Sequence, residues 1–274
     1  MTMPRLPGPK STSRIGFGTW RMGGLRSADS VHDAEETRAI GFALDHGINV
    51  LDTAEMYGAG HAEELVARAL AGRDRESIYV ITKVLPEHLD RDAVARSARA
   101  SLRRMGLTYA DLYLIHWPPE RTEMIREGIR AMEDLVREGL VRAIGVSNFG
   151  VREMEEAMAA ASRTEISANQ VKYSLRHREP EREVIPFCED HHIAVIAHTP
   201  LDRGGVADLP AVREVAGRTG HTPVQVALNY LVPRTVPIPK ATRIDHLEEL
   251  LGSLGWELSA ADRERLRSEG PPAR

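Results

Sequence analysis

Four side chains of this sequence could together deliver a proton to a carbonyl oxygen: Asp52, Tyr57, Lys83 and His116. A phenol beside a buried ammonium group is expected to have a lowered pKa, because the cation favours the phenolate. The aspartate would keep the lysine charged, and the histidine could donate a hydrogen bond to the carbonyl. Such a set supplies general acid catalysis to a carbonyl reduction. The hydride would have to come from a cofactor, because no side chain supplies one.

Short apolar runs along the sequence predict the strands that carry these residues. None of the runs shows the polar alternation of a half-exposed strand, so we predict buried parallel strands. The predicted strands are residues 15–19, 48–51, 78–82, 111–115, 141–146, 166–170, 193–197 and 235–238.

Longer amphipathic segments follow the strands and predict helices. Thr222 with Gln225 predicts a capping box, and Gly106 predicts a left-handed helix end. The predicted helices are residues 34–45, 62–70, 91–104, 123–138, 151–160, 181–191, 210–218, 222–231 and 243–251, with a last helix beginning near residue 259.

Eight strands, each followed by a helix, predict an α/β fold of the (β/α)₈ TIM-barrel type, with residues 1–274 as a single domain. A doubly wound sheet is the alternative, and it would normally carry G-x-G-x-x-G after its first strand. The segment Gly16-Phe17-Gly18 lacks the third glycine and is followed by Thr19 and Trp20 instead of a helix start. The pattern therefore favours the barrel.

A barrel places its active site at the carboxyl ends of its strands. Every predicted strand ends in, or is followed by, a residue able to hydrogen-bond, ionise or stack. Such groups cost free energy near a core unless they are paired, so together they predict one polar pocket. They are Trp20, Asp52 with Tyr57, Lys83, His116 with Trp117, Ser147 with Asn148, Asn169 with Gln170, His198 with Thr199, and Lys240.

Each of these residues alone also has a purely structural interpretation. Asp52 and Lys83 could form a structural ion pair, His116 could be a hydrogen-bonded core histidine, and Ser147 with Asn148 could cap a helix. The use of lysine favours a functional site, because only four of the 36 basic residues are lysine. Three of the four lie at or near predicted strand ends: Lys83, Lys172 and Lys240.

The ordered motifs of the chain resemble those of the aldo-keto reductase family, and the bacterial members that reduce methylglyoxal and similar small aldehydes are the most similar. The resemblance extends over essentially the whole chain. It is carried by LDTAEMYG at 51–58, ITK at 81–83, LYLIHWP at 112–118, GVSNF at 145–149, NQV at 169–171, AHTPL at 197–201 and IPK at 238–240.

The resemblance implies an NAD(P)H-dependent reductase in which Tyr57 is the general acid, Lys83 and Asp52 tune it, and His116 orients the substrate. It implies a substrate pocket framed by Trp20, Met56, Tyr57, His116 and Trp117. The implied cofactor-binding residues are Thr19, Trp20, Asp52, Ser147, Asn148, Gln170, His198, Thr199, Pro200, Leu201, Arg203, Gly204, Pro239, Lys240, Ala241, Thr242, Arg243, His246 and Glu249.

Two positions depart from the commonest family pattern. His198 stands where many members stack a tyrosine on the nicotinamide, and Leu250 stands where an asparagine often contacts the adenine. The strength of the stacking and the adenine contacts are therefore left open.

The segment after the eighth strand predicts a preference for NADPH. Lys240, Thr242 and Arg243 supply an ammonium, a hydroxyl and a guanidinium group at a helix start, which suits a 2′-phosphate. Asp245 follows and would weaken the positive charge.

Short connections predict an open pocket. The connection after His116 is short, and only residues 270–274 follow the last predicted helix. Family members with bulky substrates use longer loops at both places, so we expect broad activity on small aldehydes.

The composition excludes several other classes of protein. Forty acidic and 36 basic residues give a net charge of −4, which argues against nucleic-acid binding. No run approaches the roughly 20 apolar residues of a membrane span, and no secretory leader is recognisable. Cys188 is the single cysteine, and His191 with His192 lacks a metal-binding frame. We expect a cytoplasmic protein without a metal, as a monomer or weak oligomer.

Three other functions compete with carbonyl reduction, and a serine hydrolase is the first. Gly145 to Phe149 begins like the nucleophile elbow of a serine hydrolase but lacks the closing glycine. The second is a regulatory role in which the protein keeps the cofactor, as the channel-associated subunits of the family do. An unrelated barrel that uses Lys83 as a Schiff base is the third.

Overall fold

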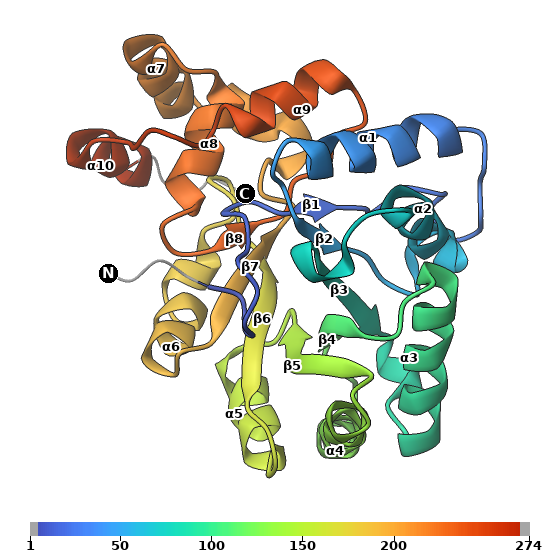
Figure 1. Ribbon diagram of the computed structural model, residues 1–274. Helices are drawn as coiled ribbons and strands as arrows, with labels where there is room; N and C mark the ends of the chain where they lie inside the picture. The colour runs from blue at the N-terminus through green and yellow to red at the C-terminus, as the bar shows by residue number, and fades with distance from the viewer. Residues whose placement is uncertain (1–4, 269–274) are drawn as a thin grey trace.

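The computed structural model describes residues 5–268, and its sheet contains eight parallel strands that follow one another in chain order. Figure 1 shows the strands curled around a common centre with helices on the outside. The alternation of strand and helix predicted from the sequence is thus confirmed. The strands are β1 (Phe17–Gly18), β2 (Val50–Asp52), β3 (Tyr79–Val84), β4 (Ala110–Ile115), β5 (Val141–Ser147), β6 (Ile166–Lys172), β7 (Ala194–His198) and β8 (Val236–Pro237).

Prolines explain why the first and last strands are short. Gly16 N donates to Pro237 O at 2.8 Å, and Gly18 N donates to Pro239 O at 3.0 Å. Neither proline has an N–H to donate to the facing strand, so the ladder between the two segments lacks these bonds. Each of the two predicted strands is therefore reduced to two residues, although β1 still lies beside β8.

Helices connect the strands, and their ends follow the predicted caps. Thr222 Oγ1 accepts from Gln225 N, and Gln225 Oε1 accepts from Thr222 N, which completes the capping box. Gly106 follows α3 with a φ of 64°. Within residues 5–268, no helix is long and apolar enough to cross a membrane. The helices are α1 (Asp33–Asp45), α2 (His61–Leu70), α3 (Arg91–Met105), α4 (Glu123–Arg137), α5 (Val151–Ala160), α6 (Val184–Asp190), α7 (Pro210–Thr219), α8 (Pro223–Leu231), α9 (Ile244–Leu251) and α10 (Ala260–Ser268).

The helix predicted at residues 181–191 is shorter than expected. A 3₁₀ turn, η4 (Glu179–Glu181), and the non-helical Glu183 precede α6, which begins at Val184. Pro186 lies in the first turn of α6, where its missing N–H leaves no helical hydrogen bond unmade. Further inside a helix the same proline would break a hydrogen bond, so the helix begins beside it.

The two adjacent histidines follow α6 instead of lying in it. His191 caps the helix and His192 has a φ of 57°, and both side chains are exposed. Among the described residues, no group of three or more His, Cys, Asp or Glu side chains is placed to hold a metal ion. The absence of a metal stays a prediction.

Two apolar layers pack on the two faces of the sheet. The larger layer lies between the strands and the helices. Side chains alternate along β3, so Lys83 points inward like Tyr79 and Ile81 and lies at the end of the inner layer. The inner layer consists of Leu6, Val50, Tyr79, Ile81, Leu112, Leu114, Ala143, Ala168, Ala194, Ile196, Val236 and Ile238.

Lys10 fixes the N-terminal segment at the opposite end of the strands. Its Nζ lies 2.8 Å from Asp111 Oδ1 and donates to the carbonyl oxygens of Arg75 at 3.0 Å and Ile78 at 2.8 Å. Leu6 from the same segment joins the inner layer. This lysine is therefore structural.

His61 links α1 to α2 close to the Tyr57 turn. Its Nε2 lies 2.8 Å from Asp33 Oδ1, and its Nδ1 lies 2.7 Å from Glu64 Oε2. Burial disfavours the imidazolium, but the hydrogen bonds and charges of the two carboxylates outweigh it and raise the pKa of His61 above its ordinary value. The folded protein therefore holds this proton more tightly than the unfolded chain does.

We predict that part of the stability vanishes as the pH rises through the raised pKa of His61. A folded-state pKa above the unfolded value of about 6.5 stabilises the protein fully below that pH and less above it. Urea unfolding between pH 5.5 and 8.5 should show the wild type losing its advantage over His61→Gln as the pH increases. A difference that stays constant with pH would contradict this role.

Candidate active site

Lys83 brings the predicted catalytic residues together at the end of β3. Its Nζ donates to Asp52 Oδ2 at 2.8 Å, to Thr53 O at 2.8 Å and to Tyr57 Oη at 3.2 Å. The lysine side chain is completely buried. The three acceptors use all three hydrogens of the ammonium group, which offsets the cost of burying the charge. A charged amine has no lone pair, so this geometry disfavours Lys83 as a Schiff-base nucleophile.

Tyr57 reaches the lysine from a tight turn after β2. The turn, η1 (Tyr57–Gly60), has left-handed backbone at Gly58 (φ 57°) and Gly60 (φ 95°). A Cβ on Gly58 would lie 2.3 Å from Gly23 O, so the turn packs directly on the loop after β1. The Lys83 Nζ lies 4.9 Å from the centre of the Tyr57 ring.

The surroundings of Tyr57 correct one prediction made from the sequence. Burial, followed by the charge of Asp52, raises the pKa of Tyr57 well above its ordinary value, whereas the Lys83 cation was expected to lower it. Burial also lowers the pKa of Lys83, while the attraction and hydrogen bond of Asp52 and the charge of Glu63 act in the opposite direction. The phenol therefore keeps its proton at neutral pH, as a proton donor must.

His116 faces Tyr57 from the loop that follows β4. The two rings have centroids 5.6 Å apart and planes at 72°. Burial, then the charge of Lys83 and the neighbouring His198, lowers the pKa of His116 to about 2, so the imidazole is neutral. Its buried Nδ1 has no hydrogen-bond partner among the described residues. A neutral ring can donate one hydrogen bond, which suits the orientation of a carbonyl oxygen.

Gln170 of β6 contacts one of the predicted catalytic residues, which the sequence did not predict. Its Nε2 donates to Asp52 Oδ1 at 2.7 Å. Thr19 Oγ1 donates to the backbone oxygen of Asp52 at 3.0 Å. Two residues predicted to contact the cofactor thus also hold Asp52 in place.

Asn148 links three of the predicted site residues. Its Nδ2 donates to His116 O at 3.1 Å and to Ser147 Oγ at 3.0 Å, and its Oδ1 lies 2.8 Å from His198 Nε2. Burial, then the charges of two lysines, lowers the pKa of His198 to about 4. The neutral His198 therefore has a defined hydrogen-bond partner, and its stacking on a nicotinamide stays a prediction.

The loop after β7 carries several of the predicted cofactor residues in a strained conformation. Positive φ angles occur at Thr199 (55°), Asp202 (45°) and Arg203 (55°), and such strain persists where the surroundings enforce it. Arg176 Nε and His177 Nε2 anchor the Asp202 carboxylate at 3.2 and 3.1 Å. The remaining predicted residues of the loop are the buried Pro200, the half-buried Leu201 and the exposed Gly204.

Two guanidinium groups lie near the ring of Trp20. Arg21 Cζ is 5.0 Å and Arg203 Cζ is 5.6 Å from the Trp20 ring. Arg203 was predicted in the site, and Arg21 was missed. Arg21 could have been predicted in the site, because it directly follows Trp20 at the end of the first predicted strand.

The residues predicted near the adenosine phosphate lie around the start of α9. Lys240 is exposed. The guanidinium of Arg243 contacts Asp245 at 3.0 and 2.6 Å, so part of the expected positive charge is neutralised. The other members are the buried Pro239 and Ala241, the half-buried Thr242 and Glu249, and the exposed His246.

Leu250 has a structural role. It is 2% exposed and belongs to the large core between the strands and the helices. Core packing therefore explains why this position is apolar. It does not depend on which residues contact the adenine.

The predicted substrate-pocket residues Trp20, Met56 and Trp117 lie beside Tyr57 or His116. Trp20 and Met56 pack against a small buried cluster that contains Tyr57. The Trp117 side chain is 47% exposed, and its ring centroid lies 6.4 Å from that of His116. These side chains form an apolar group beside the predicted catalytic residues.

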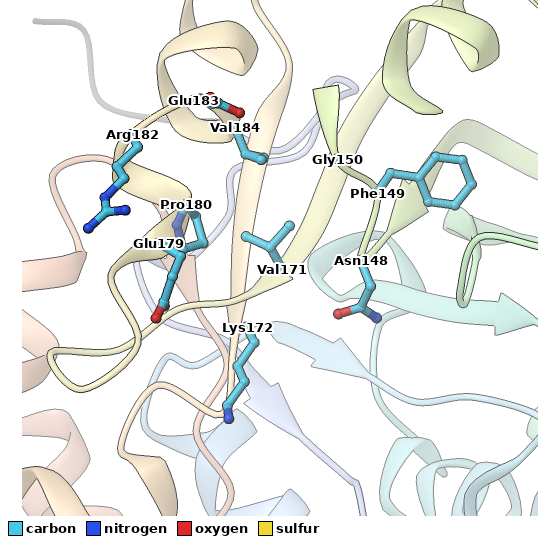
Figure 2. Close-up of a pocket in the computed structure, with 10 residues that line it drawn as sticks. All are labelled: Asn148, Phe149, Gly150, Val171, Lys172, Glu179, Pro180, Arg182, Glu183 and Val184. Atoms are coloured by element: carbon cyan, nitrogen blue, oxygen red, sulfur yellow. The ribbon is translucent and has the colours of Figure 1, made fainter. Parts of the chain in front are cut away.

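A separate hollow of about 480 Å³ adjoins this site at Asn148 (Figure 2). Lys172 and Glu179 also line it, but the four predicted catalytic residues do not. The hollow is therefore next to the candidate active site and is not the place where proton transfer would occur.

The sequence profile of the Aldo/keto reductase family matches residues 14–269. The methylglyoxal reductase YeaE of Escherichia coli is 33% identical to this chain, over 98% of this chain and 95% of its own length. The thermostable aldo-keto reductase Tm1743, solved with the inhibitor epalrestat, superposes with a TM-score of 0.92 at 37% identity, over 98% of this chain and all of its own.

An aldo/keto reductase from Klebsiella pneumoniae, solved with NADP and acetate, superposes with a TM-score of 0.89 at 33% identity, over 99% of this chain and 96% of its own. The family profile and these relatives extend over nearly all of the chain that carries the Asp52, Tyr57, Lys83 and His116 arrangement. The chain belongs to the aldo/keto reductase family.

Proposed function

We propose that this protein reduces small aldehydes and ketones to alcohols with NADPH. The observation that carries the proposal is the buried contact of Lys83 Nζ with both Tyr57 Oη and Asp52 Oδ2. This arrangement supports a proton-donating phenol beside a fixed positive charge. The family membership and the NADP complex of the Klebsiella relative support the cofactor.

The donor set of the site fits a nicotinamide cofactor. Ser147, Asn148 and Gln170 offer a hydroxyl and two amides at neighbouring strand ends, which suits a carboxamide. Arg203 and Lys240 are exposed cations that suit phosphate groups. When bound, the cofactor supplies the hydride.

The residues of the chain supply the remaining steps. The neutral His116 donates a hydrogen bond that orients the substrate carbonyl. Tyr57 holds its proton until negative charge develops on the carbonyl oxygen and then transfers it. Lys83, held by Asp52, stabilises the phenolate that remains.

Several broader expectations belong to the same proposal. Residues 1–274 form a single domain, and the hydrogen bonds between the segments of β1 and β8 support a closed (β/α)₈ barrel. The protein acts in the cytoplasm as a monomer or weak oligomer, and its partner is a small carbonyl compound, not a nucleic acid or a membrane.

We predict that Tyr57→Phe keeps the fold and cofactor binding but lowers turnover by about 10²–10⁴-fold, because only the donated proton is removed. Turnover with a small aldehyde and NADPH binding by fluorescence should be measured together. Tyr109→Phe, at the opposite end of the strands, is the matched control. Turnover of Tyr57→Phe close to the wild-type rate would refute the assignment.

We predict that the protein binds NADPH tens-fold or more tightly than NADH, since each charge-assisted hydrogen bond to a phosphate contributes about 1.5–3 kcal/mol. Lys240→Ala combined with Arg243→Ala should weaken NADPH binding selectively. Asp245→Asn should strengthen it, because it releases the Arg243 guanidinium. Equal affinity for the two cofactors in the wild type, or an equal loss for both in the double variant, would overturn the preference.

We predict broad activity on small and aromatic aldehydes with modest affinity, because the exposed Trp117 leaves one side of the pocket open. A panel of aldehydes, ketones and sugars, followed by NADPH oxidation, tests this breadth. A steep preference for one bulky ketone, with small aldehydes inert, would contradict it.

A further inference from the structure

Glu63 is a buried carboxylate that the proposed mechanism does not use. It lies in the first turn of α2, six positions after Tyr57, and its exposed fraction is 0%. Its Oε1 accepts from Thr82 Oγ1 at 2.6 Å, and its Oε2 lies 2.7 Å from both Nε and Nη2 of Arg104. Both oxygens of the carboxylate are therefore paired.

The Thr82 contact holds the strand that carries the catalytic lysine. Side chains alternate along β3, so Thr82 points toward α2 while Lys83 points inward. Glu63 binds the outer face of this strand, and Asp52 binds the lysine on its inner face. The position of Lys83 is thus fixed from two sides.

The Arg104 contact holds the turn that carries the phenol. A Cβ on Gly60 would lie 2.5 Å from Arg104 Nε and 2.7 Å from its Cδ, so the arginine packs directly on the backbone of this turn. Gly60 ends the turn that Tyr57 begins. Glu63 holds the guanidinium in this place, because its Oε2 accepts from Nε and forms an ion pair with Nη2.

Glu63 also contributes a negative charge. Burial lowers the pKa of Lys83, and the charge of Glu63 opposes this shift together with that of Asp52. Loss of the Glu63 charge would leave the Lys83 cation less favoured.

We propose that Glu63 is a positioning residue for proton transfer, which joins the strand of Lys83 to the turn of Tyr57 through Thr82 and Arg104. The proposal rests on the proposed carbonyl reduction. Glu63 is completely buried and contacts Thr82 and Arg104. It therefore acts through the positions of Tyr57 and Lys83.

The chain offers a matched control in Glu133. This glutamate is also buried (2% exposed) and paired with an arginine, Arg163, but it accepts from the backbone of residues 162–164, which precede β6. It therefore lies toward the opposite end of the strands from the catalytic residues. Glu133→Gln measures the cost of neutralising a buried glutamate without touching the site.

We expect Glu63→Gln to lower kcat by about 10-fold or more, because small displacements of reacting groups cost that much. KM and the NADPH affinity should stay near their wild-type values. The alkaline limb of the kcat profile should move to lower pH, because Lys83 loses its proton more easily. Glu133→Gln should leave both kcat and the limb unchanged.

Thr82→Val keeps the Glu63 charge and removes one hydrogen bond. It therefore tests the positioning role of Glu63 if Glu63→Gln does not fold. It should lower kcat without moving the alkaline limb. Hydrogen exchange provides a readout that needs no turnover: Glu63→Gln should accelerate exchange in residues 57–60, and Glu133→Gln should not.

Wild-type turnover is measured first, so an inactive wild type counts against the proposed function and not against Glu63. Unchanged exchange in residues 57–60 counts against Glu63 in either case. Wild-type kcat and pH profile in Glu63→Gln, or an equal loss in Glu133→Gln, would overturn the proposal. Wild-type kcat in Thr82→Val would do so where Glu63→Gln does not fold.

Discussion

The burial of one positive charge dominates this structure. Lys83 is completely enclosed, and its ammonium group would be strongly disfavoured there without partners. Asp52, the carbonyl of Thr53 and the hydroxyl of Tyr57 provide one acceptor for each hydrogen. These three acceptors stabilise the Lys83 cation at the end of the apolar inner layer.

Neighbouring elements depend on this arrangement. Gln170 of β6 and Thr19 after β1 both hold Asp52. The Tyr57 turn needs left-handed backbone and close contact with Gly23, which fixes the loop after β1 beside it. The polar groups are distributed over separate strands, so the curled sheet is what makes them neighbours. Burial, and then the charge of the same lysine, lower the pKa of His116, which remains a neutral hydrogen-bond donor.

Much of this could be predicted from the sequence, because strand-end residues and scarce lysines are local signals. The order of the strands, the capping box at Thr222 and the meeting of Tyr57 with Lys83 all follow from such signals. The lengths of β1 and β8 did not, because they depend on prolines facing glycines across the sheet. The direction of the Tyr57 pKa also depends on tertiary structure: the sequence indicates a nearby cation but not the degree of burial that outweighs it. Glu63 was missed for a related reason, since only the packed structure shows its contacts with Thr82 and Arg104.

If Lys83 acts through Tyr57, a double-mutant cycle in kcat/KM will show it. Tyr57→Phe, Lys83→Met and the double variant should be compared with the wild type under the same NADPH and aldehyde concentrations. If the lysine serves only to support the phenol, its replacement should cost little once the phenol is gone, and the double variant should resemble Tyr57→Phe. Losses that multiply in the double variant would show that the two residues act independently and that Lys83 does not act through Tyr57.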